Sequence, residues 1–218
     1  MNKIKKIVAL LLAIVIMVSV PVCTFAAEEA EKESILGADN VATMYLVFTS
    51  ANPKVPHLWI YIENETNETL NIGPYKLKPN GAVSMGAWKD RGDGAGIYIN
   101  LERHWVKDAT YGRAFYIKTN VSRSELKRIG NALDRHNYWN WGLNCAWFAT
   151  SIWNICSVKI VPFLFSPRLC LVVMLAYGAK RPDFKFKKEP NESNCYKYIT
   201  GGTLKKCSYG ATVTSTGV

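Results

Sequence analysis

The stretch His57-Leu-Trp-Ile-Tyr-Ile62 is the part of this sequence that most clearly predicts a β-strand. Aromatic and β-branched residues fill it, and both kinds favour an extended, pleated backbone. Because the side chains of a strand point alternately to its two faces, the odd-numbered residues from His57 to Tyr61 share one face. The even-numbered residues from Leu58 to Ile62 share the other. The sequence therefore places an imidazole at the start of a strand with one aliphatic face.

Further strands are expected around this segment. They cover residues 44–48, 70–77, 82–88, 96–101 and 113–118. The segment 70–77 is expected to return beside 57–62, although Gly73-Pro74 must bend or interrupt it. Pro79-Asn80-Gly81 is a turn signal between two of these strands. The middle of the chain is therefore predicted to be a run of antiparallel strands.

Two helices are expected after the strands. Ser122 and Glu125 form the sequence pattern of a capping box, and apolar residues follow at helical spacing up to Leu133. The second helix is expected to begin at Cys145, with Asn144 as its N-cap. The sequence therefore predicts a run of antiparallel strands followed by helices. We expect a single domain over residues 40–210.

The segment 158–178 is very apolar. Prolines and two basic residues interrupt it, so we predict a turn at Ser166-Pro167 followed by a helix, and no stable membrane span in the mature chain.

The chain opens with the layout of a secretory signal peptide over residues 1–26. Three lysines precede an almost unbroken apolar run over residues 7–20, and Thr24-Phe25-Ala26 then offers small residues at the −3 and −1 positions of a cleavage site. The alternative is a membrane anchor, but the run is short for a span and Pro21 ends it. We therefore expect a secreted or cell-envelope-associated protein in which residues 27–39 form a mobile leader.

The charge balance favours anionic surroundings. Residues 1–26 hold three lysines and no acids, so the remaining 192 residues carry 24 basic and 17 acidic side chains, a net charge of +7. An exported protein with this charge is attracted to anionic surfaces, so peptidoglycan or other anionic cell-envelope material is the expected partner. Alternatively, the same net charge serves only to keep the protein soluble. Basic runs interleaved with aromatic residues are missing, so no nucleic-acid partner is expected.

Five cysteines follow the predicted signal peptide: Cys145, Cys156, Cys170, Cys195 and Cys207. An odd number in an exported chain leaves at least one thiol outside intramolecular disulfides. Cys195 and Cys207 flank a Gly-rich turn and are placed to pair with each other. Cys156 and Cys170 either pair or stay as buried thiols, because their neighbours are apolar. Cys145 is the natural candidate for the unpaired thiol.

Cys145 and His57 together have the features of a catalytic pair. A thiol at a helix N-terminus lies at the positive end of the helix dipole, near unpaired backbone N–H groups that favour the thiolate. An adjacent imidazole can accept the thiol proton and return it to a leaving group, and the helix-start amides can stabilise an oxyanion. The alternatives are an edge-strand histidine and a buried, inert cysteine.

These two motifs resemble those of the circularly permuted NlpC/P60-like superfamily of papain-like thiol hydrolases, which includes the lecithin-retinol-acyltransferase-like enzymes. That group carries a histidine strand first and an Asn-Cys helix start later, as do His57-Leu-Trp-Ile-Tyr-Ile62 and Asn144-Cys145-Ala-Trp-Phe-Ala149. The resemblance covers residues 40–180. It implies an α+β, permuted papain-like fold in which a small antiparallel sheet packs against helices and presents His57 to Cys145.

A third polar residue must hold the imidazole in the right orientation. The resemblance implies that this residue lies on the strand paired with the histidine strand, where the sequence offers Asn71 or Tyr75. We select Asn71, because an amide orients the imidazole in papain-like sites. Asn100 and Glu102, further along the chain, are the remaining candidates.

The leading hypothesis is an exported cysteine hydrolase that cleaves amide or ester bonds. The resemblance implies cell-wall peptide as the substrate. Cys145 would attack, His57 would act as general base and then acid, and Trp59, Asn144 and Trp147 would contact the substrate. We expect no cofactor and no metal site, because no histidine shows metal-ligand spacing with another His or Cys.

Two other functions stay open. A non-catalytic wall-binding or interaction domain would keep the fold without a working triad. A lipid acyltransferase or hydrolase is suggested by the apolar segment 158–178.

Overall fold

The computed structural model describes residues 39–51, 56–89, 93–102, 111–164, 166–180 and 195–207. The chain divides into two compact units, Met1–Asp39 and Asn40–Val218. The predicted signal peptide and nearly all of the predicted leader lie outside the described residues. All of the architecture below belongs to the second unit.

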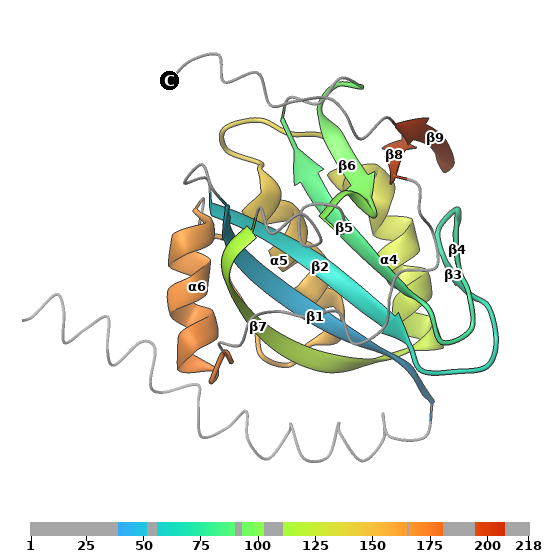
Figure 1. Cartoon of the computed structure of the whole chain (residues 1–218), viewed down its shortest axis with the longest axis horizontal. Coiled ribbons are helices and arrows are strands. Elements are labelled where there is room, and N and C mark those ends of the chain that lie inside the picture. Colours follow the sequence, from blue (N-terminus) through green and yellow to red (C-terminus); the bar gives the residue numbers. More distant parts are fainter. Residues whose placement is uncertain are drawn as a thin grey trace, which may run out of the picture. The chain divides into compact units, whose positions relative to one another are not determined.

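The described part of the second unit is built around a seven-stranded sheet in which every neighbouring pair is antiparallel. The order across this sheet is β7-β1-β2-β5-β6-β8-β9 (Figure 1). These strands are β1 (Asn40–Ala51), β2 (Pro56–Asn64), β5 (Ala82–Trp88), β6 (Gly96–Ile99), β7 (Tyr111–Ser122), β8 (Cys195–Ile199) and β9 (Thr203–Cys207).

The two faces of β2 separate as the alternation predicts. Leu58, Ile60 and Ile62 join the main core cluster, which also contains the buried side chains of the helices. Trp59 and Tyr61 belong to a second buried cluster on the opposite face. Both sets are at most 1% exposed, so β2 is a central strand with two buried faces.

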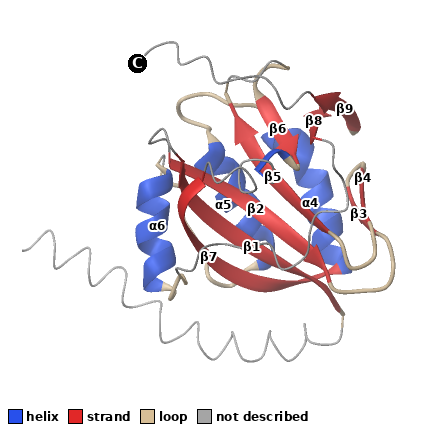
Figure 2. Cartoon of the chain, in the orientation of Figure 1, coloured by secondary structure: helices blue, strands red, loops and turns tan. Residues whose placement is uncertain are grey.

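Three helices in the described residues pack behind the sheet and beside it (Figures 1 and 2). They are α4 (Arg123–His136), α5 (Cys145–Cys156) and α6 (Pro167–Ala176). The capping box at the start of α4 is formed: the Ser122 N–H donates to Glu125 Oε2 at 2.8 Å, and the Glu125 N–H donates to Ser122 Oγ at 3.3 Å. This confirms the predicted start of the helix.

The prediction of one strand over residues 70–77 that pairs with β2 is wrong. It forms a separate two-stranded hairpin of β3 (Leu70–Ile72) and β4 (Tyr75–Leu77), turning at Gly73, whose φ is +56°. The hairpin packs closely on α4, where a Cβ at Gly130 would overlap the Gly73 backbone. The strand that returns beside β2 is instead β5, with Ile60 opposite Met85.

The mixed arrangement of sheet and helices agrees with the predicted α+β class, although the sheet is larger than expected. The helix predicted after Ser166-Pro167 is present as α6. No helix in the described part of the chain combines the length and the hydropathy needed to cross a membrane.

Candidate active site

The site forms where β2 and β5 stop pairing. Their ladder runs from Glu63↔Ala82 to Ile60↔Met85, while β2 itself extends back to Pro56. The backbone N–H of Leu58, just past the end of this ladder, donates to the sulfur of Cys145. The first residue of α5 therefore meets β2 near its beginning, beside His57.

The N-terminus of α5 is held by its N-cap. Asn144 has an extended backbone, and its Oδ1 accepts a hydrogen bond from the Ala146 N–H at 2.9 Å. This is the predicted cap, and it makes Cys145 the first helical residue. The thiol thus lies at the positive end of the helix dipole.

The thiol of Cys145 and the imidazole of His57 are hydrogen-bonded to each other. Burial acts to raise the pKa of Cys145, but the charge of His57 and the N–H groups of Leu58 and Ala146 outweigh it, so this pKa lies below its ordinary value. Burial acts to lower the pKa of His57, but Cys145 and Glu102 together raise it. Both shifts favour a thiolate–imidazolium pair.

Glu102 supplies the third group. Its Oε1 lies 3.2 Å from His57 Nε2, and neither side chain is more than 3% exposed. Because both ring nitrogens of an imidazolium carry a proton, Nε2 donates in this contact when His57 is charged. Nδ1 is then the ring nitrogen left to face the sulfur of Cys145.

The backbone at Asn100 aims Glu102 at the imidazole. Asn100 follows β6 and has a left-handed φ of 62°, a conformation that asparagine tolerates better than most residues. Its side chain is fixed on both sides: Oδ1 accepts from the Ser84 N–H at 3.2 Å, and Nδ2 donates to Tyr75 Oη at 3.1 Å. This sharp turn carries the chain back toward β5, where Glu102 reaches His57.

Gly86 in β5 leaves the space that Glu102 and His57 share. A Cβ at this position would overlap Glu102 Oε1 and lie 2.9 Å from His57 Nε2. A glycine inside a strand often marks such a close approach, so Gly86 was the sequence signal that could have located this contact.

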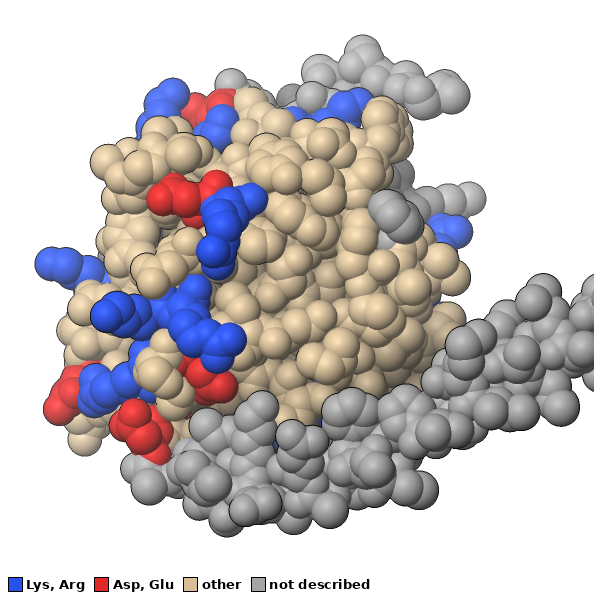
Figure 3. Space-filling view, turned by 180° about the vertical axis from the view of Figure 1, so that it is seen from behind, with Lys and Arg blue, Asp and Glu red and all other residues tan. Residues whose placement is uncertain are grey.

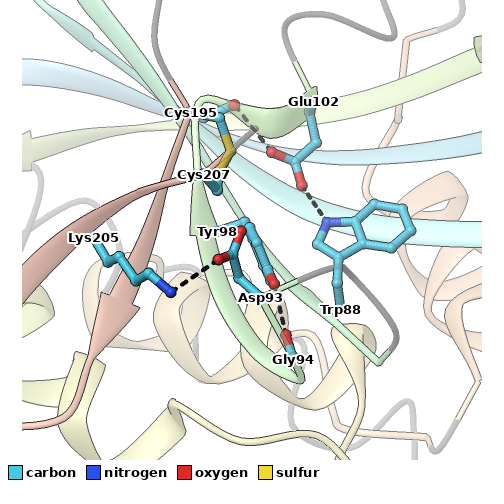
Figure 4. Close-up of a disulfide and its surroundings, with 9 residues drawn as sticks. Trp88, Asp93, Gly94, Tyr98, Glu102, Cys195, Lys205 and Cys207 are labelled. Atoms are coloured by element: carbon cyan, nitrogen blue, oxygen red, sulfur yellow. Dashed lines mark hydrogen bonds and ion pairs between the residues drawn. A yellow bond between two sulfur atoms is a disulfide. The ribbon is translucent and has the colours of Figure 1, made fainter. Parts of the chain in front are cut away.

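Two further side chains complete the surroundings of the carboxylate. Trp88 Nε1 donates to Glu102 Oε1 at 2.9 Å, and Ser84 Oγ donates to Oε2 at 3.0 Å. The Trp88 ring also lies over His57, with 3.8 Å between ring centroids. Figure 4 shows the Trp88 indole N–H directed at the Glu102 carboxylate. The buried carboxylate is thus well supplied with donors, which hold it in place.

The choice of Asn71 as the orienting residue is corrected. Asn71 is exposed on β3, opposite Lys76 in the separate hairpin, and is not brought to His57. Tyr75 and Asn100 bond to one another instead. Of the four candidates, Glu102 is the residue that contacts the imidazole.

Two of the three residues expected to contact the substrate lie near Cys145, and the third does not. Asn144 and Trp147 lie in or beside the first turn of α5, next to Cys145. Trp59 is fully buried in the second cluster with Tyr61, where its Nε1 donates to Thr49 Oγ1 at 3.3 Å. Trp59 therefore cannot line a substrate surface, and this expectation is wrong.

An aromatic loop precedes Cys145. Trp141 is 77% exposed, and Lys89 Nζ lies 4.9 Å from its ring centroid. The Asn140 side chain accepts from the N–H groups of Gly142 and Leu143 at 2.9 and 2.7 Å, which fixes the loop. This exposed indole, in the loop before Cys145, is a further substrate-facing candidate.

The other cysteines take no part in the chain of contacts from Cys145 to His57 and Glu102, although Cys170 lies close enough to Cys145 to interact with it electrostatically. Cys195 and Cys207 form a disulfide joining β8 and β9 (Figure 4). Cys156 and Cys170 are free and buried rather than paired. Burial is the main cause that raises the pKa of both thiols, the opposite of the shift at Cys145.

Comparisons of this chain with models of protein families, with curated proteins and with solved structures found no match.

Proposed function

We propose that this protein is a thiol hydrolase that cleaves amide or ester bonds, with Cys145 as nucleophile, His57 as general base and acid, and Glu102 as the residue that positions His57. The observation that carries the proposal is the buried chain of contacts from sulfur to imidazole to carboxylate. Such a chain is the arrangement that activates a cysteine nucleophile.

The reaction has two halves. The Cys145 thiolate attacks the carbonyl carbon, and the carbon–nitrogen or carbon–oxygen bond breaks as His57 gives its proton to the leaving group. This forms a thioester on Cys145. His57 then takes a proton from water, whose oxygen attacks the thioester, and the carbon–sulfur bond breaks to restore the thiolate and the imidazolium.

The oxyanion needs hydrogen-bond donors near the thiol. Among the helix-start amides, the Ala146 N–H already donates to Asn144. The backbone N–H of Cys145 itself is therefore our candidate donor, since the first N–H groups of a helix lack acceptors within it.

The support for the proposed substrate and cellular location comes from the sequence. The resemblance to the permuted NlpC/P60-like enzymes, the predicted signal peptide and the net charge of +7 after its removal together support an exported enzyme acting on cell-wall peptide.

The test compares two alanine variants at the ends of α5. Cys145→Ala should reduce the release of peptides from purified peptidoglycan by at least ~10⁴-fold, because the nucleophile is lost. Cys156→Ala removes an equally buried sulfur from the same helix and should keep activity within about twofold. Release followed by mass spectrometry measures both, and a Cys145→Ala protein that still cleaves at the normal rate refutes the assignment.

A second candidate is a non-catalytic binding domain, and the burial of the pair is the observation that favours it. His57 is 2% exposed and Cys145 is 9% exposed, so a substrate has little direct access to either. If this second function is correct, wild-type protein should bind peptidoglycan without releasing product, and the Cys145→Ala variant should bind equally well.

A further inference from the structure

The rear face of the second unit is sharply divided in charge. Figure 3 shows charged side chains gathered on the side where α4 lies, while the side of α5 and α6 is almost free of them. The sequence gives the same contrast: between Arg135 and Lys180 the only charged residues are Lys159 and Arg168, and no acidic residue occurs from 135 to 182.

Exposed apolar side chains gather in this weakly charged region. Of the nine most exposed large apolar residues in the described parts of the chain, six lie between positions 158 and 177. These six form what we call the apolar patch: Val158, Ile160, Leu169, Val172, Leu175 and Tyr177. Contiguous exposed apolar surface of this kind marks an interaction site in a folded protein.

The helix α6 contributes an outward stripe to the patch. Leu169, Val172 and Leu175 recur every three residues and are 52%, 63% and 48% exposed. Cys170 and Met174, on the other side of the helix, are fully buried in the main core. The helix therefore has enough apolar residues for its own packing and a second set directed at the surroundings.

The rest of the patch is held rigidly beside the helix. Trp153 Nε1 donates to the Lys159 carbonyl at 2.8 Å, and the Asn154 side chain makes two bonds of 3.0 Å with the Val161 backbone. Tyr177 Oη donates to the Ile160 carbonyl at 3.0 Å, which joins the end of α6 to this segment. The patch is thus one fixed surface.

We propose that the apolar patch docks on the surface of a bilayer rich in anionic phospholipids. Its apolar side chains would enter the boundary between headgroups and acyl chains, as those of interfacial helices do. Lys159 and Arg168, both exposed, would meet lipid phosphates, and no acidic residue of this segment opposes them. This proposal is independent of the hydrolase activity.

The same charges argue against a second copy of the chain as the occupant. A two-fold contact through the patch would bring Lys159 and Arg168 of one copy toward those of the other. The segment offers no acidic side chain to pair with them, so this contact would be repulsive.

The experiment is vesicle flotation of the chain from Ala27 onward. Wild-type protein should float with phosphatidylcholine vesicles that contain phosphatidylglycerol, and only weakly with pure phosphatidylcholine. The triple variant Leu169→Ser, Val172→Ser, Leu175→Ser keeps the net charge and the buried side of α6. It should lose at least ~10-fold in binding, because three apolar side chains no longer enter the interface.

A matched pair of variants tests the cations. Lys159→Ser with Arg168→Ser should weaken binding by about 10- to 30-fold, since each cation close to an anionic bilayer contributes about fivefold. Lys127→Ser with Arg128→Ser removes the same charge from the exposed side of α4 and should change binding by less than about twofold.

Several results would overturn the proposal. These are no flotation with anionic vesicles, equal flotation without anionic lipid, or equal losses from the two charge-removing pairs. A concentration-dependent dimer that the triple variant abolishes, without vesicle binding, would assign the patch to a second copy instead. Cys145→Ala should float like wild type, so loss of hydrolysis and loss of docking are distinguished.

Discussion

The two ends of α5 carry cysteines with the same burial and opposite chemistry. Cys145 is 9% exposed and Cys156 is 8% exposed, yet the pKa of the first is lowered and that of the second is raised. Burial acts to raise both values. The neighbours therefore decide the difference. Cys145 has the His57 imidazole and two backbone N–H groups, whereas Cys156 has the Glu125 carboxylate, whose effect Arg128 opposes without outweighing burial.

This contrast shows why a buried thiol need not be inert. The N-terminus of α5 concentrates N–H groups around Cys145, while Cys156 lies at the end where carbonyls are unpaired. A thiolate is stabilised at the first position and opposed at the second. Breaking the contacts of Cys145 one at a time should make it behave like Cys156.

The largest expected effect is the difference in alkylation rate between the two thiols. At pH 6.5, iodoacetamide should modify Cys145 at least ~10²-fold faster than Cys156, because the pKa is lowered at Cys145 and raised at Cys156, so the thiolate fraction is larger at Cys145. Peptide mapping by mass spectrometry separates the sites. His57→Ala should slow Cys145 by about tenfold or more. Equal rates at the two positions would show that the contrast is absent in solution.

The next effect concerns the carboxylate behind His57. Glu102→Gln should lower kcat/KM by about 10- to 100-fold, because the imidazolium loses its charged partner. Glu102 contributes to the raised pKa of His57, so its removal lets His57 lose its proton at a lower pH. The alkaline limb of the pH profile should therefore move to lower pH.

Asn71→Ala is the matched control for that variant. Asn71 is exposed on β3 and lies outside the site, so activity should stay within about twofold and the pH profile should not move. A larger loss from Asn71→Ala than from Glu102→Gln would return the orienting role to Asn71.

The sequence predicts the parts of this site that depend on local signals. The alternating residues of β2 indicate its two faces, and Asn144 indicates the start of α5, because a cap acts within a few residues of its helix. The pairing of Cys145 with His57 needs the resemblance as well, since 88 positions separate them.

Glu102 could not be selected in this way. Its contact with His57 depends on the left-handed turn at Asn100 and on β5 being the neighbour of β2, and neither is visible in a short window of sequence. The same limit explains Trp59: its face was predicted, but the sequence does not say that this face is covered. Register and long-range packing decide both cases.

The smallest expected effect comes from a single methyl group between Glu102 and His57. In Gly86→Ala, the new Cβ overlaps Glu102 Oε1, so the carboxylate must move away from the imidazole. We expect kcat/KM to fall about tenfold and the free energy of unfolding to fall by about 1–3 kcal/mol, a common result of overpacking.

Gly142→Ala, near the same thiol, is the control, because its Cβ would meet nothing closer than 3.5 Å. Thermal unfolding and alkylation of Cys145 measure the two effects. Unchanged alkylation in Gly86→Ala would mean that the thiolate does not depend on the Glu102–His57 contact.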